Sequence, residues 1–205
     1  RPVRARPFDH AARALLQGRA EREPVEGPQL WLRFAEGSIE RLEALPAPSA
    51  RRPNLAEAVY SVPDLAGRAH VLAGNALNWA GRFDAAGGQL RKAYLRFAQG
   101  SASEASFAEV ELNESQRRTF AERPAEGLLL ARRAVATFGE LGLADFVARS
   151  RVAEGLALSY LNRDEDAVKA YEAALAAFER LSLWNGWLSA LNNLTSSLVA
   201  LGRGD

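Results

Sequence analysis

The chain has no cysteine, no methionine and only two histidines among its 205 residues. Without cysteine it can form no disulfide, no thiolate zinc site and no cysteine nucleophile. His10 and His70 are isolated, and neither a His-Glu-x-x-His pattern, a phosphate-binding glycine loop nor a Gly-x-Ser-x-Gly elbow is present. We therefore expect no catalytic residue, no metal site and no cofactor, and we predict that the chain is not an enzyme.

Excess charge and long apolar segments are missing as well. The formal net charge is +1, whereas a nucleic-acid-binding protein usually carries a basic face. No apolar run approaches the about 20 residues of a membrane-spanning helix, and no signal-peptide pattern opens the chain. We expect a cytoplasmic protein that contacts neither nucleic acid nor membrane. The absence of methionine predicts a fragment of a longer protein or a processed N-terminus.

What the sequence does contain is helix-forming composition with an internal repeat. Ala and Leu dominate while β-branched residues are scarce, which favours helices. Two series of small residues recur about 40 residues apart, which predicts stacked helix pairs with one small residue in each helix. The first helices carry Gly74, Ser115, Gly155 and Thr195, and the second helices carry Ala86, Gly127 and Ala167.

Small residues let paired helices approach closely, so we expect Gly74 to face Ala86, with Leu90 and Tyr171 filling the space beside such contacts. Turn residues follow the first helices at a constant distance, namely Gly81, Asn162 and Gly202. In the second pair this slot holds Glu122, and we expect the turn at Arg123-Pro124 instead.

Capping residues set the expected helix limits. Asp64 is expected to cap a helix that ends near Ala80, and Ser101 with Glu104 forms a capping box for a helix through Phe120. Residues 1–60 fit the repeat less well. We expect helices over 8–20 and 28–45, a proline-rich loop over 46–53 and a short helix over 54–60. This part is interpreted as a degenerate repeat or helical cap, continuous with the array of residues 61–205.

The best-defined unit resembles the tetratricopeptide repeat (TPR). The TPR slots for small, large apolar, turn, Ala, aromatic and Ala residues hold Gly155, Leu158, Asn162, Ala167, Tyr171 and Ala174. The resemblance covers about residues 64–205 and implies an all-α, right-handed solenoid of about eight or nine helices. The period is about 40 rather than 34, and Arg118 replaces an apolar residue. Long periods are typical of bacterial regulatory arrays such as MalT-type sensors and Rap-type peptide receptors.

In TPR folds the first helix of each pair lines a concave groove, and the resemblance places a partner-binding site there. Side-chain amides can hold an extended peptide backbone, and aromatic residues at equal intervals can anchor apolar groups. The alternative is that the aromatic residues are core and that the asparagines bond locally. The predicted binding residues are Arg68, Asn75, Asn78, Trp79, Gln116, Phe120, Arg149, Tyr160 and Asn192.

The function predicted from these features is a non-catalytic protein- or peptide-binding module, a regulatory or scaffold part of a larger bacterial protein. Two alternatives stay open. One is a small-ligand-sensing domain of a transcriptional regulator. The other is a self-association module, with a homodimer formed through the C-terminal helix, where Trp184 and Trp187 lie.

Overall fold

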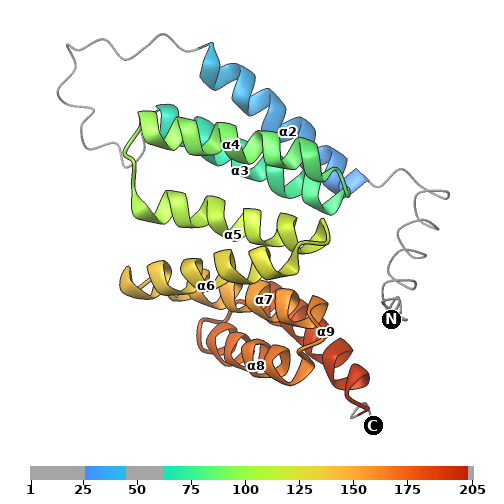
Figure 1. Ribbon diagram of the computed structural model, residues 1–205. Coiled ribbons are helices and arrows are strands. Elements are labelled where there is room, and N and C mark those ends of the chain that lie inside the picture. The colour runs from blue at the N-terminus through green and yellow to red at the C-terminus, as the bar shows by residue number, and fades with distance from the viewer. Residues whose placement is uncertain (1–25, 45–61, 203–205) are drawn as a thin grey trace.

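The computed structural model describes residues 26–44 and 62–202, and all secondary structure in these ranges is helical (Figure 1). The helices expected over 8–20 and 54–60, and the loop expected over 46–53, lie outside the described residues. The eight described helices are α2 (Glu26–Glu43), α3 (Val62–Trp79), α4 (Phe83–Gln99), α5 (Glu104–Phe120), α6 (Pro124–Glu140), α7 (Ala144–Tyr160), α8 (Asp164–Arg180) and α9 (Trp184–Ala200).

The helices pack as sequential antiparallel pairs, with α3 on α4, α5 on α6 and α7 on α8. Each pair also packs on the next, and α2 lies against α3 through Ala35 and Ile39. The first helices of the pairs, which we call the inner helices, contact one another from α3 to α5 to α7 to α9. Among the described helices, α4, α6 and α8 make no comparable contact with each other. The inner helices therefore form one continuous layer.

A residue with positive φ closes every described turn of the array. These residues fall at intervals of 20 or 21 and are Gly81, Ala102, Glu122, Gly142, Asn162, Ser182 and Gly202. The expectation that the chain turns at Arg123-Pro124 is wrong. Glu122 has a φ of 61° in the same slot as Gly81, and Pro124 is the first residue of α6. The constant turn position therefore outweighs the preference of this slot for glycine.

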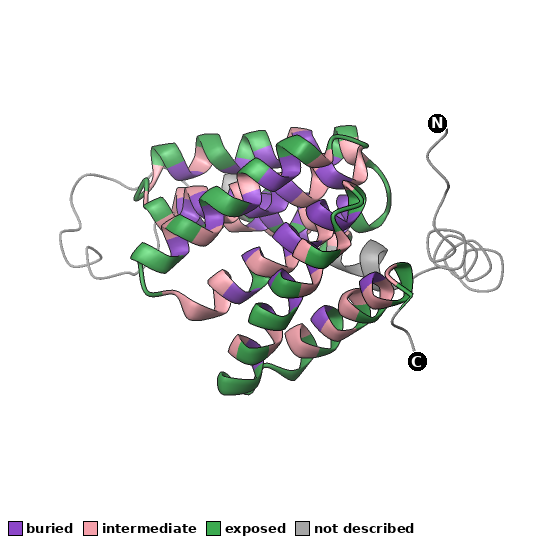
Figure 2. Ribbon diagram, turned by 60° about the horizontal axis from the view of Figure 1, so that its bottom comes forward, coloured by how far each residue is buried: buried purple, intermediate pink, exposed green. Residues whose placement is uncertain are grey.

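Small residues bring the paired helices together, as the repeat predicts. A Cβ on Gly74 would lie 2.9 Å from Leu90 Cδ2, and a Cβ on Gly155 would lie 2.6 Å from Tyr171 Cε1. In the second pair the glycine lies on the outer helix instead, because α5 carries Ser115 and α6 carries Gly127. The Ser115 hydroxyl donates to the Gly127 carbonyl oxygen at 2.8 Å. Buried residues gather where the helices face each other (Figure 2).

The expected capping box of Ser101 and Glu104 is wrong. The N-cap of α5 is Ser103, whose hydroxyl accepts from the Ser106 N–H at 3.2 Å. Ser101 bonds instead to α3 of the preceding pair, because its N–H and hydroxyl donate to the Asp64 carboxylate at 3.0 and 2.9 Å. Asp64 lies in the first turn of α3 and is 1% exposed. It therefore fastens the α4–α5 turn to the start of α3.

Candidate partner-binding face

We call the side of the array formed by α3, α5 and α7 the inner face. Most of the predicted binding residues lie there, in three rows that cross the three helices. The rows are separated along each helix by seven and then four residues, about 10 and about 6 Å. We call them the charged row (Arg68, Glu109 and Arg149), the amide row (Asn75 and Gln116) and the aromatic row (Trp79, Phe120 and Tyr160).

The charged row joins three helices around one carboxylate. Arg68 Nη1 of α3 lies 3.6 Å from Glu109 Oε2 of α5, and Arg149 of α7 is close enough to attract the same carboxylate. The Arg149 guanidinium also lies over the Phe146 ring, 5.5 Å from its centroid. Burial raises the pKa of Glu109 above its usual range, and attraction to Arg68 and Arg149 offsets only part of this effect.

The amide row is less open than the sequence suggests. Asn75 and Gln116 are half-buried, and the same slot on α7 holds Leu156. Asn78, one turn from Asn75, is 4% exposed, and its Nδ2 donates to the Asn113 carbonyl oxygen of α5 at 3.3 Å. The bond that the structure gives Asn78 thus links two inner helices, and little of its side chain faces solvent.

The aromatic row combines exposed ends with a packed centre. Trp79 is 65% exposed and Tyr160 is 38% exposed. Phe120 lies between them and contacts the Tyr160 ring edge-on, with 6.1 Å between the ring centroids. On its other side it stacks on Phe83 of α4, at 6.3 Å. Ring contacts therefore hold Phe120 in place, while Trp79 and part of the Tyr160 side chain are exposed to solvent.

Phe83 also belongs to the site, although it is absent from the predicted binding residues. It opens α4, an outer helix, where the repeat pattern predicts no binding residue. The signal that could have indicated it is its position two residues after the turn Gly81, which places a large ring beside the end of the neighbouring inner helix.

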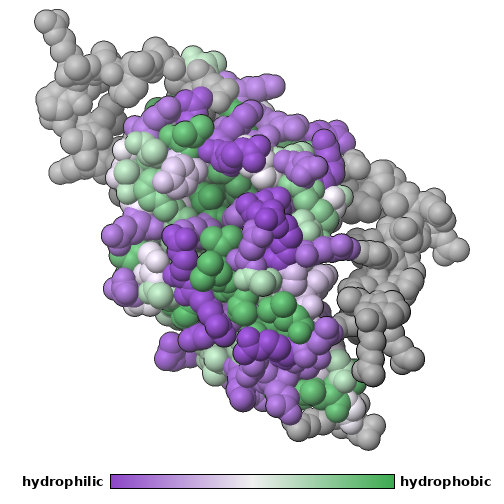
Figure 3. All heavy atoms as spheres, in the orientation of Figure 1, coloured by the Kyte–Doolittle hydropathy of each residue, from purple (hydrophilic) through white to green (hydrophobic). Residues whose placement is uncertain are grey.

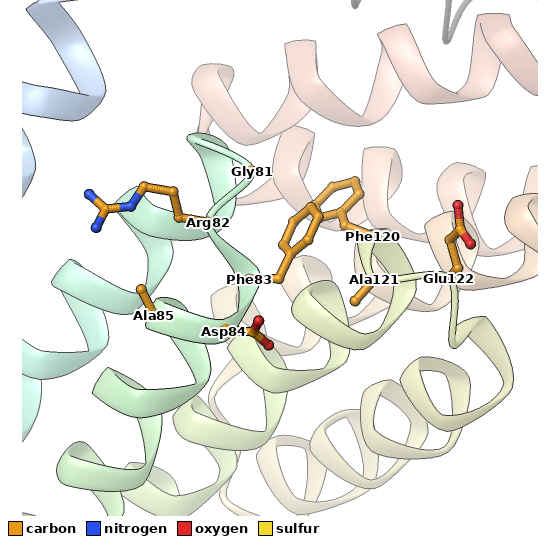
Figure 4. A pocket seen from close by; sticks show the side chains of 8 residues that line it. All are labelled: Gly81, Arg82, Phe83, Asp84, Ala85, Phe120, Ala121 and Glu122. Carbon is orange, nitrogen blue, oxygen red and sulfur yellow. The ribbon is translucent and has the colours of Figure 1, made fainter.

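Phe83 and Phe120 line an open depression between the α3–α4 turn and the α5–α6 turn (Figure 4). The two rings lie side by side in this view, and the Arg82 side chain points away from them. The other lining residues are Gly81, Asp84, Ala85, Ala121 and Glu122. The depression continues the aromatic row beyond the inner helices.

The last inner helix, α9, differs from the others in chemistry. It carries no charged residue over Trp184–Ala200. Asn192 is exposed there, and so are Trp184, Leu188 and Val199, at 59%, 53% and 55%. A hydrogen bond of 3.0 Å between the Ser159 and Ser197 hydroxyls links α9 to α7. This end of the array therefore exposes a mainly apolar helix face.

The described residues hold no group of three or more His, Asp and Glu side chains that could bind a metal ion. None of the described helices is long and apolar enough to cross a membrane. On the face seen in Figure 3, hydrophobic side chains gather in the middle and hydrophilic side chains border them.

These features define a class of protein, an all-α helical repeat protein with a TPR-like fold. Among solved structures the chain is similar to "BtubC (BKLC) from P. vanneervenii", with a TM-score of 0.61 and 17% sequence identity. The match covers 86% of this chain and 69% of that chain. At this level of sequence identity the match shows a shared fold alone. The structural similarity confirms the predicted fold class. No family model and no curated protein matches the chain.

Proposed function

We propose that the chain is a non-catalytic module that binds a segment of another protein across the inner face of α3, α5 and α7. The observation that carries the proposal is the aromatic row, whose outer members Trp79 and Tyr160 are exposed beside a centre fixed by ring contacts. Exposed aromatic side chains on a rigid support are typical binding hot spots, because they bury much area and lose little conformational entropy.

The charged and amide rows support the same proposal. Extended segments need partners for their backbone N–H and C=O groups, and the half-buried Gln116 amide offers both a donor and an acceptor. The Asn75 Oδ1 is buried, so Asn75 cannot serve a partner as an acceptor. Arg149 is exposed, and no carboxylate of the described residues lies within ion-pair distance of it. Its guanidinium lies over the Phe146 ring and attracts Glu109 from a distance, and a partner's carboxylate would add to these contacts. Helical repeats of this fold generally bind proteins along such a layer.

The experiment is a selection from a random peptide library with the intact chain, followed by affinity measurements on the selected peptides. We expect the double variant Trp79→Ala/Tyr160→Ala to bind the peptides at least about tenfold more weakly, since two anchors are removed. Leu129→Ala is the matched control, because Leu129 is 62% exposed on the outer helix α6. The proposal fails if no peptide is selected, or if selected peptides bind the double variant as tightly as the wild type.

A second candidate, self-association, is favoured by α9. Its exposed Trp184, Leu188 and Val199 and its lack of charge suit a contact with a second copy of the chain. Light scattering after size exclusion would then show a dimer that Leu188→Glu dissociates. A monomer at all concentrations tested would reject this candidate.

In either form we propose a regulatory or scaffold role within a larger, cytoplasmic bacterial protein, on the strength of the long repeat period of about 40 residues. Sensing of a small ligand is the weaker alternative. The depression at Phe83 and Phe120 is open to solvent, whereas small-ligand sites bury most of their ligand.

A further inference from the structure

The depression between the α3–α4 and α5–α6 turns combines aromatic rings with acidic side chains. The Phe83 and Phe120 rings are inclined by 21°, with their centroids 6.3 Å apart. Glu122 and Asp84 contribute carboxylates to its lining, and neither lies within ion-pair distance of a described basic group. A planar cation binds such a combination well, because it can stack on the rings and donate to a carboxylate.

The basic groups near the depression are directed elsewhere. Arg118 pairs with Glu114 and Glu126, and Arg123 pairs with Glu126. Arg82 belongs to the lining, but its side chain points away from the rings (Figure 4). Arg117 attracts Asp84 from a distance, while its own guanidinium donates to Glu114 at 2.7 and 2.5 Å. Local charge therefore favours a cationic ligand group.

The helix ends at the depression act in opposite senses. α5 ends at Phe120, and the partial negative charge of its last carbonyls favours a cation. α4 begins at Phe83 with the opposite partial charge, which Asp84 in its first turn offsets. With Asp84 offsetting the α4 N-terminus, the negative charge that remains at the depression comes from Glu122 and the end of α5.

We propose that this depression receives an arginine side chain of the bound protein segment, stacked on Phe83 and Phe120 and bonded to Glu122. The inference rests on the proposed function and adds the chemistry of one position of the partner. An apolar side chain in the same place would strip water from Glu122 without replacing its hydrogen bonds, and an acidic side chain would be repelled.

The probe is N-acetyl-arginine methylamide, compared with its citrulline analogue, which keeps the planar shape and loses the charge. Binding is followed by NMR signals of the isotope-labelled chain. We expect the arginine probe to shift the signals of Gly81, Phe83 and Phe120, and the citrulline probe to bind at least about fivefold more weakly. Added salt should weaken the arginine complex.

Two variants locate the effect. Glu122→Gln removes the charge but keeps a similar side chain at the positive-φ position, and it should weaken arginine binding several-fold. Glu140→Gln, at the exposed end of α6, is the matched control and should change nothing. The inference is overturned if arginine and citrulline bind equally, if neither shifts these signals, or if both variants behave alike.

Failure of this inference is distinguishable from failure of the proposed function. If selected peptides need Trp79 and Tyr160 but tolerate citrulline in place of each of their arginines, the inner face binds segments and the arginine site is wrong. If the arginine probe binds and no peptide is selected, the site exists and the segment-binding function is wrong.

Discussion

Two half-buried carboxyl groups on α5 have opposite effects on the stability of this protein. Glu109 and Glu114 lie on the same helix, with side chains 19% and 20% exposed. Burial raises the pKa of both carboxyl groups, but hydrogen bonds from Arg117 and Arg118 bring the pKa of Glu114 below its usual value. Glu109 has only its ion pair with Arg68 and the longer-range attraction of Arg149 to offset the burial. Glu109 also lies deeper among protein atoms than Glu114. Side-chain exposure alone therefore does not predict the direction of the pKa shift.

The two carboxyl groups should give opposite pH dependence of stability. Glu109 has a folded-state pKa above 4.5, so its ionisation opposes folding above that pKa, and the penalty disappears as pH falls to 4.5 and below. Glu114 has a folded-state pKa below 4.5, so it stabilises the fold above 4.5 and loses this contribution as pH falls through the folded value.

We therefore expect Glu109→Gln to raise the free energy of unfolding at pH 7 and Glu114→Gln to lower it. Urea unfolding at pH 7 and at successively lower pH measures both effects, and each should shrink on acidification. If both variants changed the free energy of unfolding in the same direction at pH 7, the different surroundings of Glu109 and Glu114 would not explain their contributions to stability.

Buried serines offer a second test at this scale. Ser150 and Ser115 are both 0% exposed, but the Ser150 hydroxyl has no hydrogen-bond partner among the described residues, whereas Ser115 donates to Gly127. Ser150→Ala should stabilise the protein by up to about 1 kcal/mol, and Ser115→Ala should destabilise it by about 1 kcal/mol. Thermal unfolding of the two variants provides the measurement. A loss of stability in Ser150→Ala would mean that its hydroxyl is satisfied by water.

At the scale of elements, the repeat positions predicted helix pairing well and the turns less well. Gly74 and Gly155 lie where paired helices touch, and a larger side chain would not fit there. Because small residues recur at this position in each repeat, a single sequence is enough to predict the contact. Glu122 was misjudged because the spacing of the whole array, not the local residue preference, fixes that turn. Ser101 was misjudged because its partner Asp64 is 37 residues away.

The site was predictable to a similar degree. The rows on α3, α5 and α7 follow from the repeat register, which places Arg68, Glu109 and Arg149 in equivalent positions. Burial of Asn78 and the involvement of Phe83 were not predictable, because both depend on how neighbouring helices pack side by side. Whether these rows bind a partner stays a prediction.

Glycines inside helices should respond to substitution according to what lies opposite. In Gly155→Ala the new methyl group would meet the Tyr171 ring, which is 1% exposed, so we expect a loss of about 1–3 kcal/mol. Gly139 on α6 has nothing within 4 Å of the corresponding position, so Gly139→Ala should gain up to about 1 kcal/mol from helix propensity. Chemical denaturation compares the two. If both variants lost the same free energy of unfolding, close contact between helices would not explain the loss in Gly155→Ala.

At the scale of the whole molecule, each described helix makes its main contacts within its own pair and with the adjacent pairs. Phe97, Phe138 and Phe178 repeat this packing, one at each outer helix, and all are at most 2% exposed. Stability in such an array is approximately a sum of local and nearest-neighbour terms. A defect at one end should therefore stay local.

Hydrogen exchange can test this expectation. Phe178→Leu should speed amide exchange in α7, α8 and α9, and leave α3 and α4 nearly unchanged. Phe97→Leu is the mirror control and should affect α3, α4 and α5. Uniform acceleration along the chain in either variant would indicate that the array unfolds as one cooperative unit.

The even spacing of the positive-φ turns also limits how such a chain can change length. One helix and its turn occupy about 20 residues, so inserting or deleting a single unit would reverse the direction of every later helix and exchange inner with outer positions. Charged, amide and aromatic positions would then face away from their counterparts. Duplication or loss of about 40 residues keeps these positions on the same face as their counterparts. An ancestral lineage could thus lengthen this surface only two helices at a time, and each addition would extend all three rows together.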